Sequence, residues 1–209
     1  MIIEVCAESY EYAVKAEKAG ADRIELCKDL HLDGLTPDYE SAKKTIDTLN
    51  IPVFILIRPR AGDFMYSNEE FELMKKYIIR FKEMGCKGIV SGVLNDDNSI
   101  DIERTKELVE LSRPLEFTFH RAFDEVKDPV EEIENLIKMG INRVLTSGQK
   151  EKVIDGLVLL EQLNNISNNR IVIIPGSGIS KKNLKNFELF KEVHGSFKDE
   201  INLNGFKLC

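Results

Sequence analysis

Two glutamates and two cysteines stand at matching positions of the first two β-strand patterns in the sequence. Glu4 and Cys6 alternate with apolar residues in the first pattern, and Glu25 and Cys27 do so in the second. Because successive side chains of a strand point to opposite faces, the acids and the thiols share one face. Thiolates select Cu(I) over hard cations, so Cys6 and Cys27 are candidate copper ligands. Buried cysteine is also an ordinary small core residue, and that interpretation stays open.

Three further strand patterns place a cation or an imidazole on the same inward face, at Arg58, His120 and His194. A buried carboxylate is costly without a cation, so Glu4 and Glu25 would require either Arg58 or a metal ion. In an enzyme, one carboxylate would act as general base, His120 as acid or electrophile, and Arg58 as a clamp for an anionic oxygen. A divalent metal held by Glu4, Glu25 and His120 is a variant of that hypothesis.

Small and hydroxyl residues follow the sixth, seventh and eighth strand patterns. Gly176 and Gly178 precede a helix start, where backbone N–H groups can approach a bound anion, and Gly195, Thr146 and Ser147 extend the same rim. Phosphate sites in (β/α)8 proteins commonly use the loops after strands seven and eight. The third glycine of a dinucleotide fingerprint is missing, so we expect no nucleotide cofactor. A tight turn that needs glycine is the alternative interpretation.

Eight short β-branched runs alternate with helical patterns and predict repeated β/α units around a parallel sheet. The predicted strands are 2–6, 23–27, 53–58, 88–92, 115–120, 143–147, 171–175 and 192–195. Ser67 and Glu70 form a capping-box pattern ahead of a helix at 71–84, and Pro129 after Asp128 marks another helix start.

A repeated motif sharpens the prediction of the fold. A helix end, a glycine and a strand start recur at Gly20, Gly85 and Gly140, about every second β/α unit. The alternation of two kinds of unit favours an even-numbered closed array. We therefore predict a (β/α)8 TIM barrel, with an open doubly wound sheet as the alternative. The candidate residues would then meet at the C-terminal end of the barrel, where enzymes with this fold keep their sites.

Length and charge limit the classes of partner. The 209 residues suit one domain, 1–209, and 36 acidic against 29 basic side chains give a net charge of −7. This balance disfavours nucleic acid and anionic membrane as partners. No signal-peptide pattern is present, and the longest apolar stretch, 51–57, is far shorter than the ~18 residues of a membrane span, so we expect a cytoplasmic protein. The tail 197–209 is too short for a full closing helix, so the eighth helix should be missing or shortened and leave apolar surface for a second copy.

Several longer strings resemble the CutC family, which is named for copper homeostasis. They are EVC at 4–6, GADRIELC at 20–27, GLTP at 34–37, IRPRAGDF at 57–64, TFHRAFD at 118–124, LTSGQ at 145–149 and EVH at 192–194. The resemblance implies a (β/α)8 barrel, a cytoplasmic location, a homo-oligomer and a Cu(I) site whose paired cysteines match Cys6 and Cys27.

Three functions are therefore open. The first is Cu(I) binding through Cys6 and Cys27, with the acids and histidines around the ion. The second is a general acid/base enzyme, of isomerase or lyase type, acting on a small phosphorylated metabolite. This hypothesis assigns catalytic roles to Glu4, Glu25, Arg58 and His120, whereas Cu(I) binding by two thiolates does not require these residues. The third is a barrel that serves only as an interaction scaffold.

Overall fold

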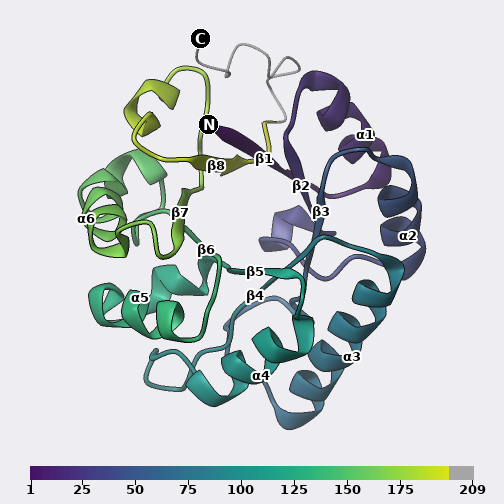
Figure 1. Cartoon of the computed structure of the whole chain (residues 1–209), viewed down its shortest axis with the longest axis horizontal. Coiled ribbons are helices and arrows are strands. Elements are labelled where there is room, and N and C mark those ends of the chain that lie inside the picture. Colours follow the sequence, from purple (N-terminus) through teal and green to yellow (C-terminus); the bar gives the residue numbers. More distant parts are fainter. Residues whose placement is uncertain (198–209) are drawn as a thin grey trace.

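The computed structural model describes residues 1–197, in which eight parallel strands curl into a barrel (Figure 1). The strands are β1 (Ile2–Ala7), β2 (Arg23–Leu26), β3 (Val53–Leu56), β4 (Gly88–Ser91), β5 (Glu116–Phe119), β6 (Arg143–Thr146), β7 (Val172–Pro175) and β8 (Glu192–Gly195). Each predicted strand coincides with an observed one to within one or two residues at its ends.

The strands are ordered β7-β6-β5-β4-β3-β2-β1-β8, so the first strand pairs with both the second and the last. Within the described residues, β7 and β8 lie next to each other but form no hydrogen-bonded ladder, and the barrel is nearly closed. The predicted (β/α)8 barrel is confirmed. The open doubly wound alternative is wrong, because the two end strands of the sheet, β7 and β8, lie next to each other.

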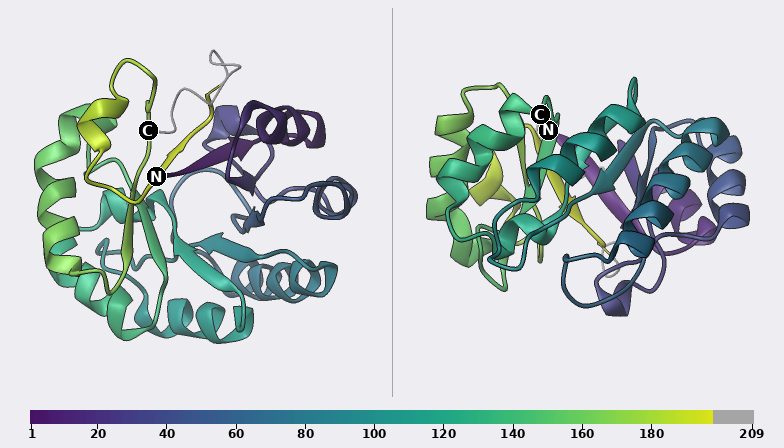
Figure 2. Two further views of the ribbon diagram at one scale, coloured as in Figure 1. Left: turned by 45° about the horizontal axis from the view of Figure 1, so that its top comes forward. Right: turned by 90° about the horizontal axis from the view of Figure 1, so that it is seen from below.

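Six α-helices in the described part of the chain surround the strands (Figures 1 and 2). They are α1 (Tyr10–Ala19), α2 (Tyr39–Thr48), α3 (Asn68–Met84), α4 (Ile102–Ser112), α5 (Pro129–Lys138) and α6 (Leu157–Ser167). The predicted capping box at the start of α3 is present: the Ser67 hydroxyl accepts from the Glu70 N–H, and the Glu70 carboxylate accepts from the Ser67 N–H. Asp128 caps α5 ahead of Pro129, also as predicted.

The connection between β7 and β8 departs from the repeated β/α unit. A short 3-10 helix, η4 (Leu184–Phe187), stands there in place of an α-helix. Its buried Leu184 and Phe187, together with Phe190, supply the apolar cover on this side of the barrel. The predicted shortened eighth helix lies outside the described residues, apart from the first residue of the predicted tail, Phe197.

Alternation along the strands separates two apolar clusters. Residues such as Ile3, Val5 and Ile24 belong to the large core between strands and helices. A smaller cluster inside the barrel consists of Cys6, Cys27, Phe54, Leu56 and Val90. The predicted assignment of thiols to the inner face and aliphatic neighbours to the outer face is confirmed. No helix in the described part of the chain is both long and apolar enough to cross a bilayer.

Candidate functional site

A cavity of about 530 Å³ opens at the C-terminal end of the strands. Of the residues singled out in the sequence, it is lined by Cys6, Glu25, Arg58, His120, Gly178, His194 and Gly195. Residues from opposite sides of the barrel therefore line one cavity. This agrees with the prediction that these side chains point to the inside of the barrel.

The two thiols lie side by side at one wall of this cavity. The Sγ atoms of Cys6 and Cys27 are 3.4 Å apart, and both side chains are buried. Cys6 reaches the cavity, whereas Cys27 lies behind it with its Sγ 3.6 Å from the carbonyl oxygen of Ala7. The hydrogen bond to Cys27, together with burial, raises the pKa of the Cys6 thiol well above its usual value. In the absence of a metal, Cys6 therefore keeps its proton at neutral pH.

Glu25 is a buried carboxyl group beside the thiols. One carboxyl oxygen lies 3.9 Å from the Sγ of Cys6, and the other has no hydrogen-bond partner within residues 1–197. Burial, reinforced by the charge of Glu4, raises the pKa of Glu25 to about 7, although His194 acts in the opposite direction. Near neutral pH this group can therefore hold or release a proton.

His194 lies between the two glutamates. Its Nδ1 is 2.7 Å from a carboxylate oxygen of Glu4 and 4.0 Å from one of Glu25. Burial alone would lower the pKa of His194, but the charges of Glu25 and Glu4 outweigh it and raise that pKa. The imidazole is therefore held in its cationic form more strongly than a free histidine.

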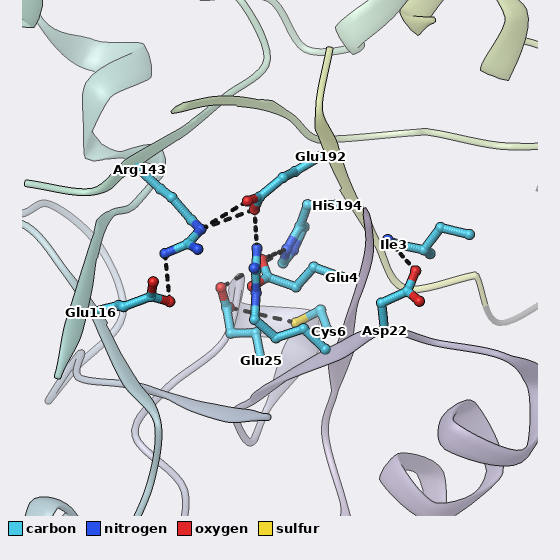
Figure 3. Close-up of polar contacts among 10 residues, drawn as sticks. Ile3, Glu4, Cys6, Asp22, Glu25, Glu116, Arg143, Glu192 and His194 are labelled. Atoms are coloured by element: carbon cyan, nitrogen blue, oxygen red, sulfur yellow. Dashed lines mark hydrogen bonds and ion pairs between the residues drawn. The ribbon is translucent and has the colours of Figure 1, made fainter. Parts of the chain in front are cut away.

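The cation that neutralises Glu4 is Arg23 and not Arg58, contrary to the expectation from the sequence. The Nε of Arg23 is 2.5 Å from a Glu4 oxygen. Burial alone would raise the pKa of Glu4, but Arg23 and His194 lower it to about 2. Arg23 also pairs with Glu192. Glu192 in turn lies 3.0 Å from Arg143 (Figure 3). The same alternation that found Glu25 and His194 could have found Arg23 and Glu192, because each stands two residues earlier on the same face.

Arg58 holds loops together at the cavity wall. Its guanidinium donates to the backbone carbonyls of Leu32, Gly34 and Gly62, at 2.8, 3.1 and 2.8 Å. Gly34 has a φ of 85°, and a Cβ there would lie within 2.9 Å of the Leu56 side chain, so a larger residue would be strained in this turn.

His120 is buried against Phe64, with ring centroids 4.8 Å apart. Burial, with a contribution from the charge of Arg58, lowers the pKa of His120 to about 3, so the imidazole is neutral at physiological pH. Its Nδ1 accepts a hydrogen bond from the Ala122 N–H at 3.3 Å.

The residues predicted to bind phosphate divide into two groups. The hydroxyls of Thr146 and Ser147 donate to Asp124, at 2.5 and 3.0 Å, and the Gly176 N–H donates to the Thr146 carbonyl. Gly178 and Gly195 line the cavity. The structure thus brings only the second group to the open space, and phosphate binding by the whole set stays a prediction.

A group of metal-ligand types also forms within the described residues. The group consists of Cys6, Glu25 and His194, each of which offers one ligand atom. These three atoms lie within 4.8 Å of one another, and all three side chains are buried. Sulfur and imidazole donors suit a soft ion. His194 moreover directs its Nδ1 to a carboxylate, an arrangement common for histidines beside protein-bound metals.

The fold and the site together define a (β/α)8-barrel protein with a buried cluster of thiols, carboxyls and an imidazole at the mouth. The sequence model of the CutC family matches residues 1–199, and the chain belongs to this family. The mouse copper homeostasis protein cutC homolog is 48% identical over 184 residues, which cover 88% of this chain and 68% of the mouse protein. The human homolog is 46% identical and covers the same share of this chain and 67% of its own length.

A solved structure gives the same result for the fold. The crystal structure of the putative copper homeostasis protein CutC from Streptococcus agalactiae superposes with a TM-score of 0.89 at 32% identity. The match covers 94% of this chain and 98% of the streptococcal one. The resemblance noted in the sequence is thereby confirmed.

Proposed function

We propose that this protein binds Cu(I) at the mouth of the barrel, with Cys6 and Cys27 as the sulfur ligands. The observation that carries the proposal is the 3.4 Å separation of their Sγ atoms at the wall of a cavity. Cu(I) prefers soft donors, and a pair of thiolates is such a donor set. Membership of a family named for copper homeostasis supports the choice of metal.

The surroundings of the thiols are suited to the charge of such a complex. Two thiolates and one Cu(I) carry a net charge of −1, which is costly to bury without compensation. His194, whose pKa is raised, provides a positive charge next to them. Glu25, with a pKa of about 7, can take up a proton and so avoid adding a second negative charge.

Binding also has a proton requirement. Because the pKa of Cys6 is raised, the thiol must lose a proton that it holds firmly in the metal-free protein. Metal binding to thiols releases protons, so the Cu(I) affinity should increase with pH.

The test is an anaerobic titration against a Cu(I) chelator that buffers the free ion. We expect Cys6→Ser and Cys27→Ser each to weaken binding by more than the roughly 10- to 100-fold that loss of an outer-shell partner costs. The double variant should lose binding at the same free Cu(I) concentration. Cys86→Ser is the matched control, since Cys86 is a buried thiol in the core outside the barrel. Undiminished binding by the double variant would reject the site.

The enzymatic alternative has less support. Glu4, one of the two candidate bases, is bound by Arg23 and His194 and has a pKa of about 2, which makes it a poor proton acceptor. The hydroxyls of Thr146 and Ser147 are already committed to Asp124. We therefore favour copper binding over turnover of a phosphorylated metabolite.

The proposal includes a cytoplasmic homo-oligomer. Val158 and Leu189 are 82% and 57% exposed, the highest values among the large hydrophobic side chains described, and they offer apolar surface to a second copy. Light scattering after size-exclusion chromatography measures the mass in solution, and a monomer at all concentrations would contradict this part of the proposal.

A further inference from the structure

His120 lines the cavity on the wall opposite the thiols, and one of its ring nitrogens has no partner among the described residues. His120 follows β5, which lies four strands from β1 in the barrel. Because its Nδ1 accepts the Ala122 N–H, the proton of the neutral ring sits on Nε2. This Nε2 is buried and has no hydrogen-bond partner within residues 1–197, although His120 lines the cavity. A buried donor of this kind requires an explanation.

A buried positive charge lies close to this donor. Arg58 is 5% exposed, and no carboxylate in the described part of the chain lies within ion-pair distance of it. The three hydrogen bonds of its guanidinium all go to neutral carbonyls, and its Nε–H has no partner among the described residues. Glu125 lies near enough to interact with the charge of Arg58, but no ion pair between the two is found in the described residues. Burying a cation without an ion-pair partner is costly, so an anion near Arg58 would be stabilised.

One aromatic ring joins the two groups. Phe64 contacts His120 with a centroid distance of 4.8 Å, and the guanidinium carbon of Arg58 is 5.0 Å from the centre of the same ring. Leu56 and Leu145 add apolar surface to the cavity lining. This wall therefore combines an N–H donor, a positive charge and apolar surface.

The charges of the remaining lining residues limit the ligand. Arg121 is already paired with Asp124 at 2.8 Å, and Lys150 is the remaining lysine or arginine of the lining. Asp33, Glu125 and Glu151 line the same cavity, as Glu25 does, and negative charges there repel a doubly charged group more strongly than a singly charged one. A singly charged group with an apolar body meets these conditions better than a phosphate dianion.

We propose that this wall of the cavity is a binding site for a small organic monocarboxylate. One carboxylate oxygen accepts from the Nε2–H of His120, the charge lies in the field of Arg58, and the apolar body packs on Phe64. This site is separate from the thiols, so it does not depend on the proposed copper binding.

The test follows the Nε2–H of His120 by ¹⁵N NMR in metal-free protein at constant ionic strength. The probes are sodium acetate, sodium pyruvate, inorganic phosphate and, as the salt control, sodium chloride. We expect a saturable shift of the His120 signal with acetate or pyruvate, and no saturable shift with chloride. This measurement needs no variant, so it does not depend on whether a mutant folds.

Variants then locate the site. His120→Phe removes the donor and with it the NMR signal, so binding of acetate and pyruvate to the variants is measured by isothermal titration calorimetry. This variant should bind the carboxylates about tenfold more weakly or worse, as expected for loss of a hydrogen bond to a charged group. His31→Phe changes an exposed histidine and should leave binding unchanged. The Cys6→Ser and Cys27→Ser double variant should bind the carboxylate as the wild type does, so failure of the copper site is distinguishable. Absence of a saturable shift with both carboxylates, or tighter binding of phosphate than of either, would overturn the proposal.

Discussion

Two glutamates on neighbouring strands acquire opposite properties from their partners. Glu4 lies against Arg23 and His194, and its pKa falls to about 2 despite its burial. Glu25 is equally buried, but its contact with the His194 imidazole is 4.0 Å long, and its pKa rises to about 7. The first is a fixed negative charge that orients His194, whereas the second titrates near neutral pH.

The raised pKa of Glu25 predicts a pH dependence of stability in the metal-free protein. A carboxyl group whose pKa rises on folding stabilises the fold fully below pH 4.5, and this contribution is lost as the pH rises through 7. Glu25→Gln removes the dependence, so the variant should gain up to roughly 3 kcal/mol relative to the wild type as the pH rises from about 4.5 to about 8. Urea unfolding across this range measures the difference. The exposed Glu161→Gln is the control, and a stability difference between the wild type and Glu25→Gln that stays constant with pH would refute the assignment.

Much of the site could be predicted from single residues because the strands alternate so regularly. Glu4, Cys6, Glu25 and Cys27 all point inward, as expected. The pairing of Glu4 with Arg23 is harder to predict, since an arginine at the start of a strand also suits a solvated end. The commitment of Thr146 and Ser147 to Asp124 depends on a loop conformation that strand alternation does not determine.

At the scale of elements, the start of α3 gives a local test of the fold. Ser67 accepts from the Glu70 N–H at 3.2 Å and satisfies a donor that the first turn leaves free. Ser67→Ala should lower the free energy of unfolding by about 1 kcal/mol, measured by urea denaturation. Ser67→Thr keeps the hydroxyl and should cost less. No loss in Ser67→Ala, or an equal loss in the two variants, would show that the hydroxyl does not stabilise the start of α3.

The regular elements are the most predictable part of the fold. Gly20 and Gly85, at φ values of 104° and 93°, end α1 and α3 as the repeated motif indicates. The 3-10 helix in place of a seventh α-helix is not apparent from the sequence. Buried Leu184, Phe187 and Phe190 give that segment an apolar pattern that a helix would also show.

At the scale of the whole molecule, the barrel has a seam between β7 and β8. In the described residues no ladder joins these strands, although Glu192 at the start of β8 bonds to Arg23 of β2 and Arg143 of β6. Side chains inside the barrel thus connect β8 to strands on both sides of the seam. The same network includes Glu4, which pairs with Arg23. Glu4 also contacts His194 (Figure 3).

The seam predicts uneven protection in hydrogen exchange. Peptides covering β7 and β8, which each have one hydrogen-bonded neighbour, should exchange faster than those covering β2 and β3, which have two. Mass spectrometry of deuterium uptake measures this. Equal protection of all four strands would mean that a ladder closes the barrel in solution.

The central claim is that one Cu(I) ion binds between the sulfurs of Cys6 and Cys27 at the barrel mouth. The most direct test is a crystal of the protein loaded anaerobically with one equivalent of Cu(I), with an anomalous difference map measured at the copper absorption edge. The account predicts a single strong peak within bonding distance of both Sγ atoms. A peak at another position, or no peak at the thiols in a loaded crystal, would contradict it.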